Sequence, residues 1–139
     1  MKILLVDDEP MLIESVTIGL KCKGYKVLEA NSVEKALDLL SGEGNMINLV
    51  ITDYLMPVTN GMDLLKAVRR SNPTLPVIMM TGYADTRLVI EAINNQISGF
   101  IEKPFSLQQL IYEIARVTNS SLKEQEDWRR ASRVKFPAQ

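Results

Sequence analysis

The sequence predicts an α/β fold in which a parallel sheet of five strands is covered by helices on both faces. Five short apolar runs alternate with five segments of helical periodicity between residue 2 and about residue 117. This alternation is typical of βαβ units, whose crossovers should be right-handed. The chain has 139 residues, which is the length of one such domain. We find no internal repeat or low-complexity segment that would suggest another architecture.

Residues that are favoured at helix ends mark the limits of the first two predicted helices. In chain order the predicted elements are a strand at 2–6, a helix at 10–22, a strand at 25–29, a helix at 32–40, a strand at 47–52, a helix at 61–70, a strand at 75–80, a helix at 84–94, a strand at 98–102 and a helix at 106–117. Pro10 suits a first helical position, and Gly24 follows the end of that helix. The second helix has Asn31 or Ser32 as its N-cap and Gly42 near its end.

Two later helices carry similar signals. Arg69 and Arg70 stand in the last turn of the helix at 61–70, where the helix dipole favours cations. Ser106 followed by Gln109 resembles a capping box, which predicts the start of the last helix.

The composition excludes several classes of function. The formal net charge is −1, so no bulk electrostatic argument favours binding of nucleic acid or of a membrane. No apolar stretch approaches the roughly 18 residues of a membrane span, and acids cut short the apolar run at the N-terminus. We therefore expect residence in the cytoplasm. Cys22 is the only cysteine and histidine is absent, so an intrachain disulfide, an imidazole metal site and a phosphohistidine on this chain are all excluded.

The last residues differ from the rest in kind. We expect a domain over residues 1–120, followed by a segment over residues 121–139 that is a helix extension, a linker or a tail. Its five basic residues stand against three acidic ones, whereas the preceding part has an excess of acids. It is too short to form a domain of its own.

Polar residues follow four of the predicted strands at the points where the strands end. These residues are the pair Asp7-Asp8, Asp53, Thr81 and Lys103. The carboxyl ends of parallel strands meet at one edge of a sheet, so the four groups should share a crevice. Three carboxylates and one ammonium suit a hard divalent cation and a phosphoryl group.

Each group also has a simpler interpretation. Asp7 and Asp8 precede Pro10, where acids commonly cap a helix. Asp53 could start a turn, Thr81 could be ordinary strand-end chemistry, and Lys103 could be a surface lysine before a proline. The occurrence of all of them at strand ends favours a functional site.

The motifs resemble the receiver domain of two-component response regulators. The resemblance is carried by Asp7-Asp8, by Asp53-Tyr54-Leu55-Met56-Pro57 with Gly61, by Thr81-Gly82 and by Lys103-Pro104-Phe105. It spans residues 1 to about 120, in the family's order, and as a set these motifs are highly specific. It implies a flavodoxin-like, doubly wound five-stranded parallel sheet with strand order 2-1-3-4-5.

The resemblance also implies a role for each acid. Asp53 would be the phospho-acceptor, a carboxylate nucleophile that takes a phosphoryl group from a partner's phosphohistidine. Asp8 and Asp53 would bind Mg²⁺ through carboxylate oxygens, Leu55 would bind it through its backbone carbonyl, and Asp7 mainly through water.

The remaining roles belong to the phosphoryl group and to the switch. Lys103 would pair with Asp53 or with phosphoryl oxygens, and a cis peptide bond before Pro104 is expected. Thr81 would hydrogen-bond one phosphoryl oxygen. Phe100 matches the family's aromatic switch position. Phosphorylation would then change the surface formed by the fourth helix, fifth strand and fifth helix.

The chain departs from the family's pattern at one turn. Gln96-Ile97 stands where many receivers have glycine-alanine, so we expect Asn95 to end the fourth helix, because Asn tolerates the left-handed conformation. Leu55 and Tyr83 occupy positions that vary among receivers and influence how long the phosphoryl group lasts.

The leading hypothesis is a signalling switch rather than an enzyme. Its partners would be a sensor histidine kinase or histidine phosphotransfer protein and an effector that the sequence does not identify. Pairing with a second copy of the chain is a further alternative. Neither nucleic acid nor membrane is expected to bind these residues. The alternatives are a Mg²⁺-dependent phosphatase or phosphotransferase acting on small molecules, and an interaction module that keeps the fold without being phosphorylated.

Overall fold

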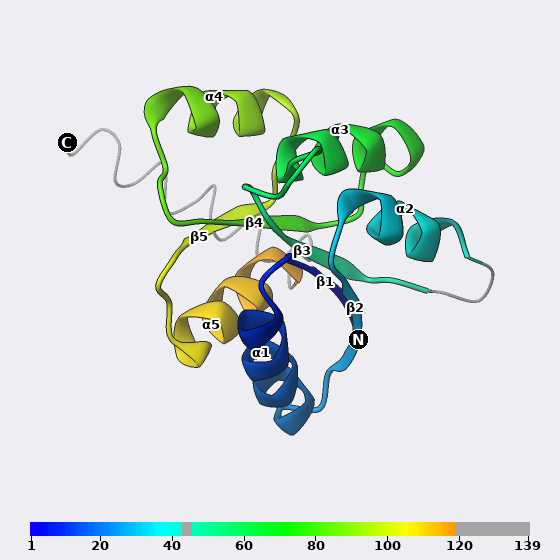
Figure 1. Ribbon diagram of the computed structural model, residues 1–139, viewed down its shortest axis with the longest axis vertical. Coiled ribbons are helices and arrows are strands. Elements are labelled where there is room, and N and C mark those ends of the chain that lie inside the picture. The colour runs from blue at the N-terminus through cyan, green and yellow to red at the C-terminus, as the bar shows by residue number, and fades with distance from the viewer. Residues whose placement is uncertain (43–45, 119–139) are drawn as a thin grey trace, which may run out of the picture.

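The computed structural model describes residues 1–42 and 46–118 as a five-stranded parallel sheet with helices on both faces (Figure 1). The strand order is β2-β1-β3-β4-β5, as the resemblance implies. All four neighbouring pairs are parallel. The strands are β1 (Lys2–Val6), β2 (Lys26–Ala30), β3 (Leu49–Asp53), β4 (Val77–Thr81) and β5 (Gly99–Glu102).

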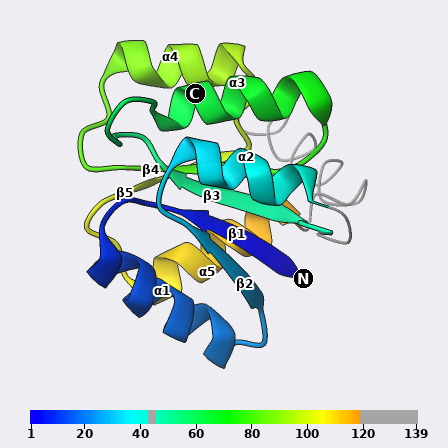
Figure 2. The same ribbon diagram turned by 45° about the vertical axis from the view of Figure 1, so that its right-hand side comes forward.

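The helices divide into two layers. They are α1 (Pro10–Cys22), α2 (Val33–Ser41), α3 (Gly61–Ser71), α4 (Thr86–Asn94) and α5 (Leu107–Thr118). Both views show α1 and α5 on one face of the sheet and α2, α3 and α4 on the other (Figures 1 and 2). The doubly wound architecture predicted from the alternation of elements is therefore confirmed.

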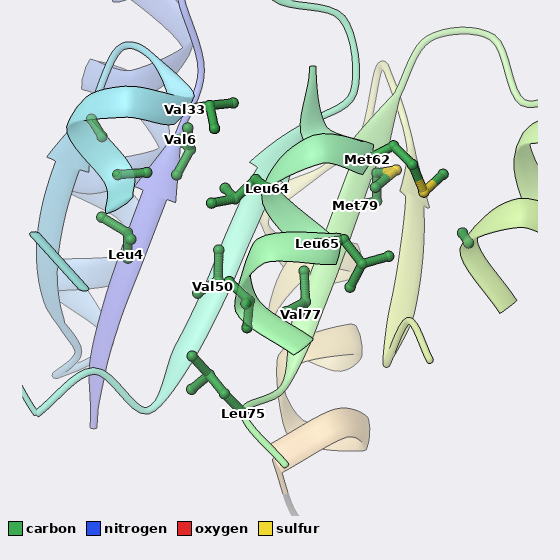
Figure 3. Packing of buried hydrophobic residues seen from close by; sticks show 14 of the residues in the cluster. Leu4, Val6, Val33, Val50, Met62, Leu64, Leu65, Leu75, Val77 and Met79 are labelled. Atoms are coloured by element: carbon green, nitrogen blue, oxygen red, sulfur yellow. The ribbon is translucent and has the colours of Figure 1, made fainter. Parts of the chain in front are cut away.

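Two apolar cores follow from the alternation of side chains along the strands. Leu4, Val50 and Val77 belong to the core under α2, α3 and α4. Their neighbours along the strands, such as Ile51 and Ile78, belong to the core under α1 and α5. Figure 3 shows the first core, in which α3 packs over the strands that carry Val50 and Val77. Because the sheet is buried on both faces, its strands read as nearly continuous apolar runs.

The predicted boundaries hold to within two residues, and local chemistry explains the differences. The fourth strand starts at Val77, because Pro76 has no N–H to donate to a ladder and the Leu75 carbonyl accepts a hydrogen bond from Arg69. The fourth helix starts at Thr86, because the Asp85 side chain accepts a hydrogen bond from the Leu88 N–H and caps it there.

The sequence signals for helix starts are confirmed. Ser32, rather than Asn31, is the N-cap of α2 and accepts a hydrogen bond from the Lys35 N–H. Ser106 and Gln109 exchange the two hydrogen bonds of a capping box before α5.

The turn after α4 differs from the expectation in one respect. Asn95 is the C-cap, as predicted, but the left-handed residue is Gln96, with φ 63°. The Gln96 N–H donates to the Ile93 carbonyl and the Ile97 N–H to the Ala92 carbonyl, which is the Schellman pattern. That pattern places the left-handed conformation one residue beyond the C-cap, and a glutamine there pays a steric cost that glycine would avoid.

Two further expectations from the sequence concerned membrane spans and the segment over residues 121–139. No helix within residues 1–42 and 46–118 is long and apolar enough to cross a membrane. The segment over residues 121–139 lies outside the described residues.

Candidate functional site

Two buried aspartates share one lysine at the carboxyl edge of the sheet. Asp7 follows β1 and is fully buried, and Asp53 is the last residue of β3 and is 7% exposed. The Lys103 ammonium lies 2.9 Å from Asp7 Oδ2 and 3.3 Å from Asp53 Oδ1. Charges removed from water are stable only when they are paired, so this contact lets two acids occupy the interior.

Strand order and side-chain alternation explain why these three groups meet. β1 and β3 are neighbours, so their carboxyl ends lie side by side. Asp7 and Asp53 continue the series of alternate residues that faces α1 and α5. Lys103 follows β5 with the same parity as Ile101 and reaches both acids from across β4.

Asp8 completes an acidic cluster. It is exposed, unlike Asp7 and Asp53, and oxygens of the three carboxylates lie within 4.8 Å of one another. A hard divalent cation such as Mg²⁺ takes oxygen ligands and keeps several waters. An all-oxygen donor set that opens to solvent at Asp8 therefore fits such an ion.

Asp7 is engaged on both of its oxygens. Oδ1 accepts a hydrogen bond from the Glu9 N–H at 2.9 Å, and Oδ2 accepts one from Lys103. The N-cap of α1 is Glu9, which makes no side-chain capping bond. Neither Asp7 nor Asp8 is therefore the N-cap of α1, and Asp8 and Asp53 are left as the carboxylates more open to a direct ligand.

The charge of Lys103 does not fully offset the cost of ionising Asp53 beside Asp7. Burial, and then the charge of Asp7, raise the pKa of Asp53 above its ordinary value, although Lys103 acts in the opposite direction. Burial alone would lower the pKa of Lys103, but its hydrogen bond to Asp7 and the charges of both acids raise it overall. The site therefore holds more negative charge than one lysine offsets.

Thr81 and Phe100 belong to the opposite face of the sheet from Asp7, Asp53 and Lys103. Both have the parity of the face that α2, α3 and α4 cover, and Phe100 packs against the core on that face. The Thr81 hydroxyl donates to the Tyr83 carbonyl at 3.0 Å and accepts from the Tyr83 N–H at 3.1 Å. The peptide bond between Lys103 and Pro104 is cis, as the resemblance implies.

Two exposed side chains stand in the loops beside the carboxylates. Leu55, two residues after Asp53, is 68% exposed, and Tyr83, two residues after Thr81, is 76% exposed. Apolar and aromatic surface thus lies in solvent within two residues of Asp53 and of Thr81.

Gly61 has a structural role that the sequence analysis did not identify. Its N–H donates to the Tyr54 carbonyl at 2.8 Å, which brings the start of α3 back against the end of β3. A Cβ at this position would overlap the backbone oxygen of Asp53. The motif drew attention to Gly61, but only the fold shows why a glycine is needed there, because the return of the loop creates the close approach.

Arg69 also has a larger role than the helix dipole predicts. Its guanidinium donates to the backbone carbonyls of Asn72, Leu75 and Gln96 and to the Ser98 hydroxyl. It thereby joins the end of α3 to the turn that leads into β5. No local sequence signal pointed to these partners.

The family comparison agrees with this geometry. The model of the response regulator receiver domain matches residues 3–115. The chain is 35% identical over 120 residues to the transcriptional regulatory protein CpxR of Escherichia coli, a match that covers 86% of this chain and 50% of CpxR. It is 35% identical over 115 residues to the response regulator protein FleR of Pseudomonas aeruginosa, covering 83% of this chain and 24% of FleR.

Further relatives extend the comparison. A sensor kinase, CckA of Brucella abortus, is 34% identical over 108 residues, which are 78% of this chain and 11% of CckA. The chain thus spans half or less of the length of these three curated relatives.

Solved structures share the architecture almost completely. The chemotaxis protein CheY4 of Vibrio cholerae has a TM-score of 0.77 at 29% identity, covering 84% of this chain and 97% of CheY4. A CheY-like receiver domain from Methanospirillum hungatei has a TM-score of 0.80 at 26% identity, covering 91% of this chain and 97% of its own. The fold, the clustered acids with their lysine and the match over residues 3–115 lead to one conclusion: this chain belongs to the family of response regulator receiver domains, which are signalling domains.

Proposed function

We propose that Asp53 accepts a phosphoryl group and that this modification switches the protein between two signalling states. The observation that carries the proposal is the position of the Asp53 carboxylate, 3.3 Å from the Lys103 ammonium and within 4.8 Å of carboxylate oxygens of Asp7 and Asp8. A nucleophilic carboxylate beside a cation and further oxygen ligands is the arrangement that phosphoryl transfer requires.

The transfer uses few protein groups. One Asp53 oxygen forms a bond to phosphorus as the bond from phosphorus to the donor nitrogen breaks, and the electron pair of that bond stays on the nitrogen, which then takes a proton. Lys103, which lies 3.3 Å from Asp53 Oδ1, would pair with the oxygens of the transferred group. Charge stabilisation and in-line positioning, rather than covalent machinery, account for the catalysis.

A bound Mg²⁺ would supply the positive charge that one lysine leaves missing. Asp8 and Asp53 would hold it directly, with the Leu55 carbonyl as a further ligand and Asp7 acting mainly through water. The engagement of both Asp7 oxygens by Glu9 and Lys103 supports this division.

The phosphoryl donor is a phosphohistidine on another protein. This chain contains no histidine, so a sensor histidine kinase or a histidine phosphotransfer protein would have to provide it. The output passes to an effector or to a second copy of the chain through the surface of α4, β5 and α5.

Thr81 and Phe100 form the switch in this proposal. A phosphoryl oxygen would draw the Thr81 hydroxyl away from Tyr83, and the Phe100 ring would move towards the space that Thr81 leaves. The new hydrogen bond exists in only one of the two states, so it supplies the free-energy difference that shifts the equilibrium.

One experiment separates this function from its alternatives. The protein is incubated with acetyl phosphate and Mg²⁺, and its intact mass is followed together with the release of inorganic phosphate. A protein heavier by one phosphoryl group supports the receiver function. Rapid multiple turnover without an adduct would indicate a small-molecule phosphatase, and neither adduct nor turnover would indicate an interaction module that is not phosphorylated.

We expect Asp53→Asn to abolish phosphorylation and to leave the fold intact. The change is nearly isosteric and removes the nucleophile and one charge of the cluster. Phosphorylation is measured by intact mass, and folding by circular dichroism. Asp38→Asn, an exposed aspartate on α2, is the matched control and should label like the parent. Equal labelling of the Asp53 variant would refute the assignment of the acceptor.

We expect Asp8→Ala to weaken Mg²⁺ binding at least about tenfold, since even partners outside the first coordination shell commonly change metal affinity by that factor. Binding is followed through amide chemical shifts during a Mg²⁺ titration. Glu9→Ala removes the same charge from an adjacent exposed acid and should bind Mg²⁺ like the parent. If the Asp8 variant titrates unchanged, the ion binds elsewhere.

The raised pKa of Asp53 predicts a pH-dependent penalty on stability. Well below its unfolded pKa, the carboxyl group is protonated in both states and costs nothing. As the pH rises through the folded pKa, the fold opposes ionisation and the free energy of unfolding falls. Asp53→Asn should therefore be more stable than the parent at pH 7 in EDTA.

The stability difference should narrow as the pH is lowered towards 4 and when Mg²⁺ is added. Urea titrations at a series of pH values provide the measurement, again with Asp38→Asn as the control. A variant that is equally or less stable at pH 7 would contradict the assigned cause of the shift.

We expect the phosphoryl group to be long-lived because Leu55 and Tyr83 offer no carboxylate or amide to orient an attacking water. The double variant Leu55→Asn, Tyr83→Glu should lose its phosphoryl group several-fold faster. Leu37→Asn, Tyr112→Glu makes the same changes at exposed sites on α2 and α5 and serves as control. Decay that is equal or slower in the first variant would eliminate this explanation.

A further inference from the structure

The C-terminal end of α4 is joined to α3 by Arg69. The guanidinium donates to the Gln96 carbonyl twice, from Nε at 3.0 Å and from Nη2 at 2.8 Å. Nη1 donates to the Leu75 carbonyl at 2.6 Å and to the Asn72 carbonyl at 3.2 Å. A planar guanidinium serves these acceptors together because its donors are arranged as a rigid fork.

The residues that follow this turn are held from the opposite face. Arg116 of α5 donates to the Ser98 carbonyl at 3.1 Å, and Glu113 accepts a hydrogen bond from the Phe100 N–H at 3.1 Å. Arg116 and Glu113 also pair with each other, and a Cβ at Gly99 would overlap Glu113 and come into tight contact with Arg116. Residues 96–100 are therefore fastened by α3 on one side of the sheet and by α5 on the other.

The N-terminal end of α4 is attached quite differently. Residues 82–87 are all exposed. Asp85 caps its own helix, so its hydrogen bond moves with α4. Two hydrogen bonds between the Thr81 hydroxyl and the Tyr83 backbone join this segment to the sheet, and the first residue beyond it that is buried in the core is Leu88. These two hydrogen bonds belong to the same hydroxyl that a phosphoryl oxygen would recruit.

We propose that α4 pivots about the turn held by Arg69, so that phosphorylation displaces its N-terminal end and leaves residues 96–98 in place. The inference rests on the proposed function, because it takes a phosphoryl group on Asp53 as the trigger. Arg69 is a positioning residue: it touches neither the carboxylates nor Lys103, and acts through the turn that it holds.

The geometry of α4 favours a pivot over a translation. A helix moves nearly as a rigid rod, and nine residues span about 13 Å. With one end fixed, the displacement grows along the rod and is largest beside Thr81. Lys66 pairs with Glu91 at 2.9 Å nearer the fixed end, and a single exposed ion pair of this kind contributes little to holding a helix.

The test is residue-resolved hydrogen exchange with and without saturating acetyl phosphate and Mg²⁺, after intact mass has verified the adduct. In the parent, the amide of Tyr83 should exchange about tenfold faster once Thr81 leaves it, as expected for a local opening. The amides of Ile97 and Ser98 should exchange at an unchanged rate.

The matched variants are Arg69→Lys and Arg70→Lys, adjacent arginines of α3 that receive the same substitution. In the Arg69 variant, a single ammonium cannot replace the fork, so the phosphorylation-dependent change should spread to Ile97 and Ser98. In the Arg70 variant, it should stay confined as in the parent. A uniform rise in exchange in both states of the Arg69 variant would show a merely structural role and overturn the pivot.

Failure of the pivot and failure of the proposed function give different results. If an adduct forms on the parent and Ile97 and Ser98 respond as strongly as Tyr83, α4 does not pivot there, while phosphorylation stands. The parent alone decides this point, so an Arg69 variant that does not fold leaves the inference falsifiable. Absence of any adduct would overturn the proposed function and the pivot together.

Discussion

The pairing of Lys103 with two buried acids is the interaction on which the rest of this structure depends. Asp7 is fully buried and Asp53 nearly so, and neither could remain ionised in the interior without a cation. The cation comes from the end of β5, and the acids come from the ends of β1 and β3. The contact therefore depends on a parallel sheet in which β1 lies beside β3 and only β4 separates β3 from β5. Topology and charge balance support each other.

The two faces of the sheet divide the work. The alternation of side chains puts Asp7, Asp53 and Lys103 on the face of α1 and α5, and Thr81 and Phe100 on the face that α4 covers. The proposed phosphorylation would therefore take place on one side of the sheet, while the proposed switch residues Thr81 and Phe100 belong to the other. Thr81 stands at the carboxyl end of β4, where the two sides meet.

The surrounding frame compensates for a site that is not optimised for stability. The raised pKa of Asp53 shows that its ionised form is disfavoured where it stands. The proposed function would need the charge of Asp53 and the exposure of Asp8, and proteins commonly trade stability for activity at such places. Continuous apolar strands, capped helices and arginine bonds to backbone carbonyls supply the rigidity around it. The segment before α4, by contrast, is exposed and is joined to the sheet by the hydrogen bonds between Thr81 and Tyr83.

The sequence by itself determined the architecture and the members of the site. Apolar runs of strand length, helical periodicity and capping residues depend on nearest neighbours, and polar residues at strand ends must meet at one edge of a parallel sheet. The tertiary structure alone decided which groups pair. It showed that Lys103 pairs with Asp7 as well as with Asp53. It also showed that Asp7 is not the N-cap of α1 and that Gln96 is the left-handed residue of the turn after α4. It also assigned Gly61 and Arg69 their roles. The contacts of Lys103 with Asp7 and of Arg69 with Gln96 join residues far apart in the chain, so their distances follow from packing, which no local pattern encodes.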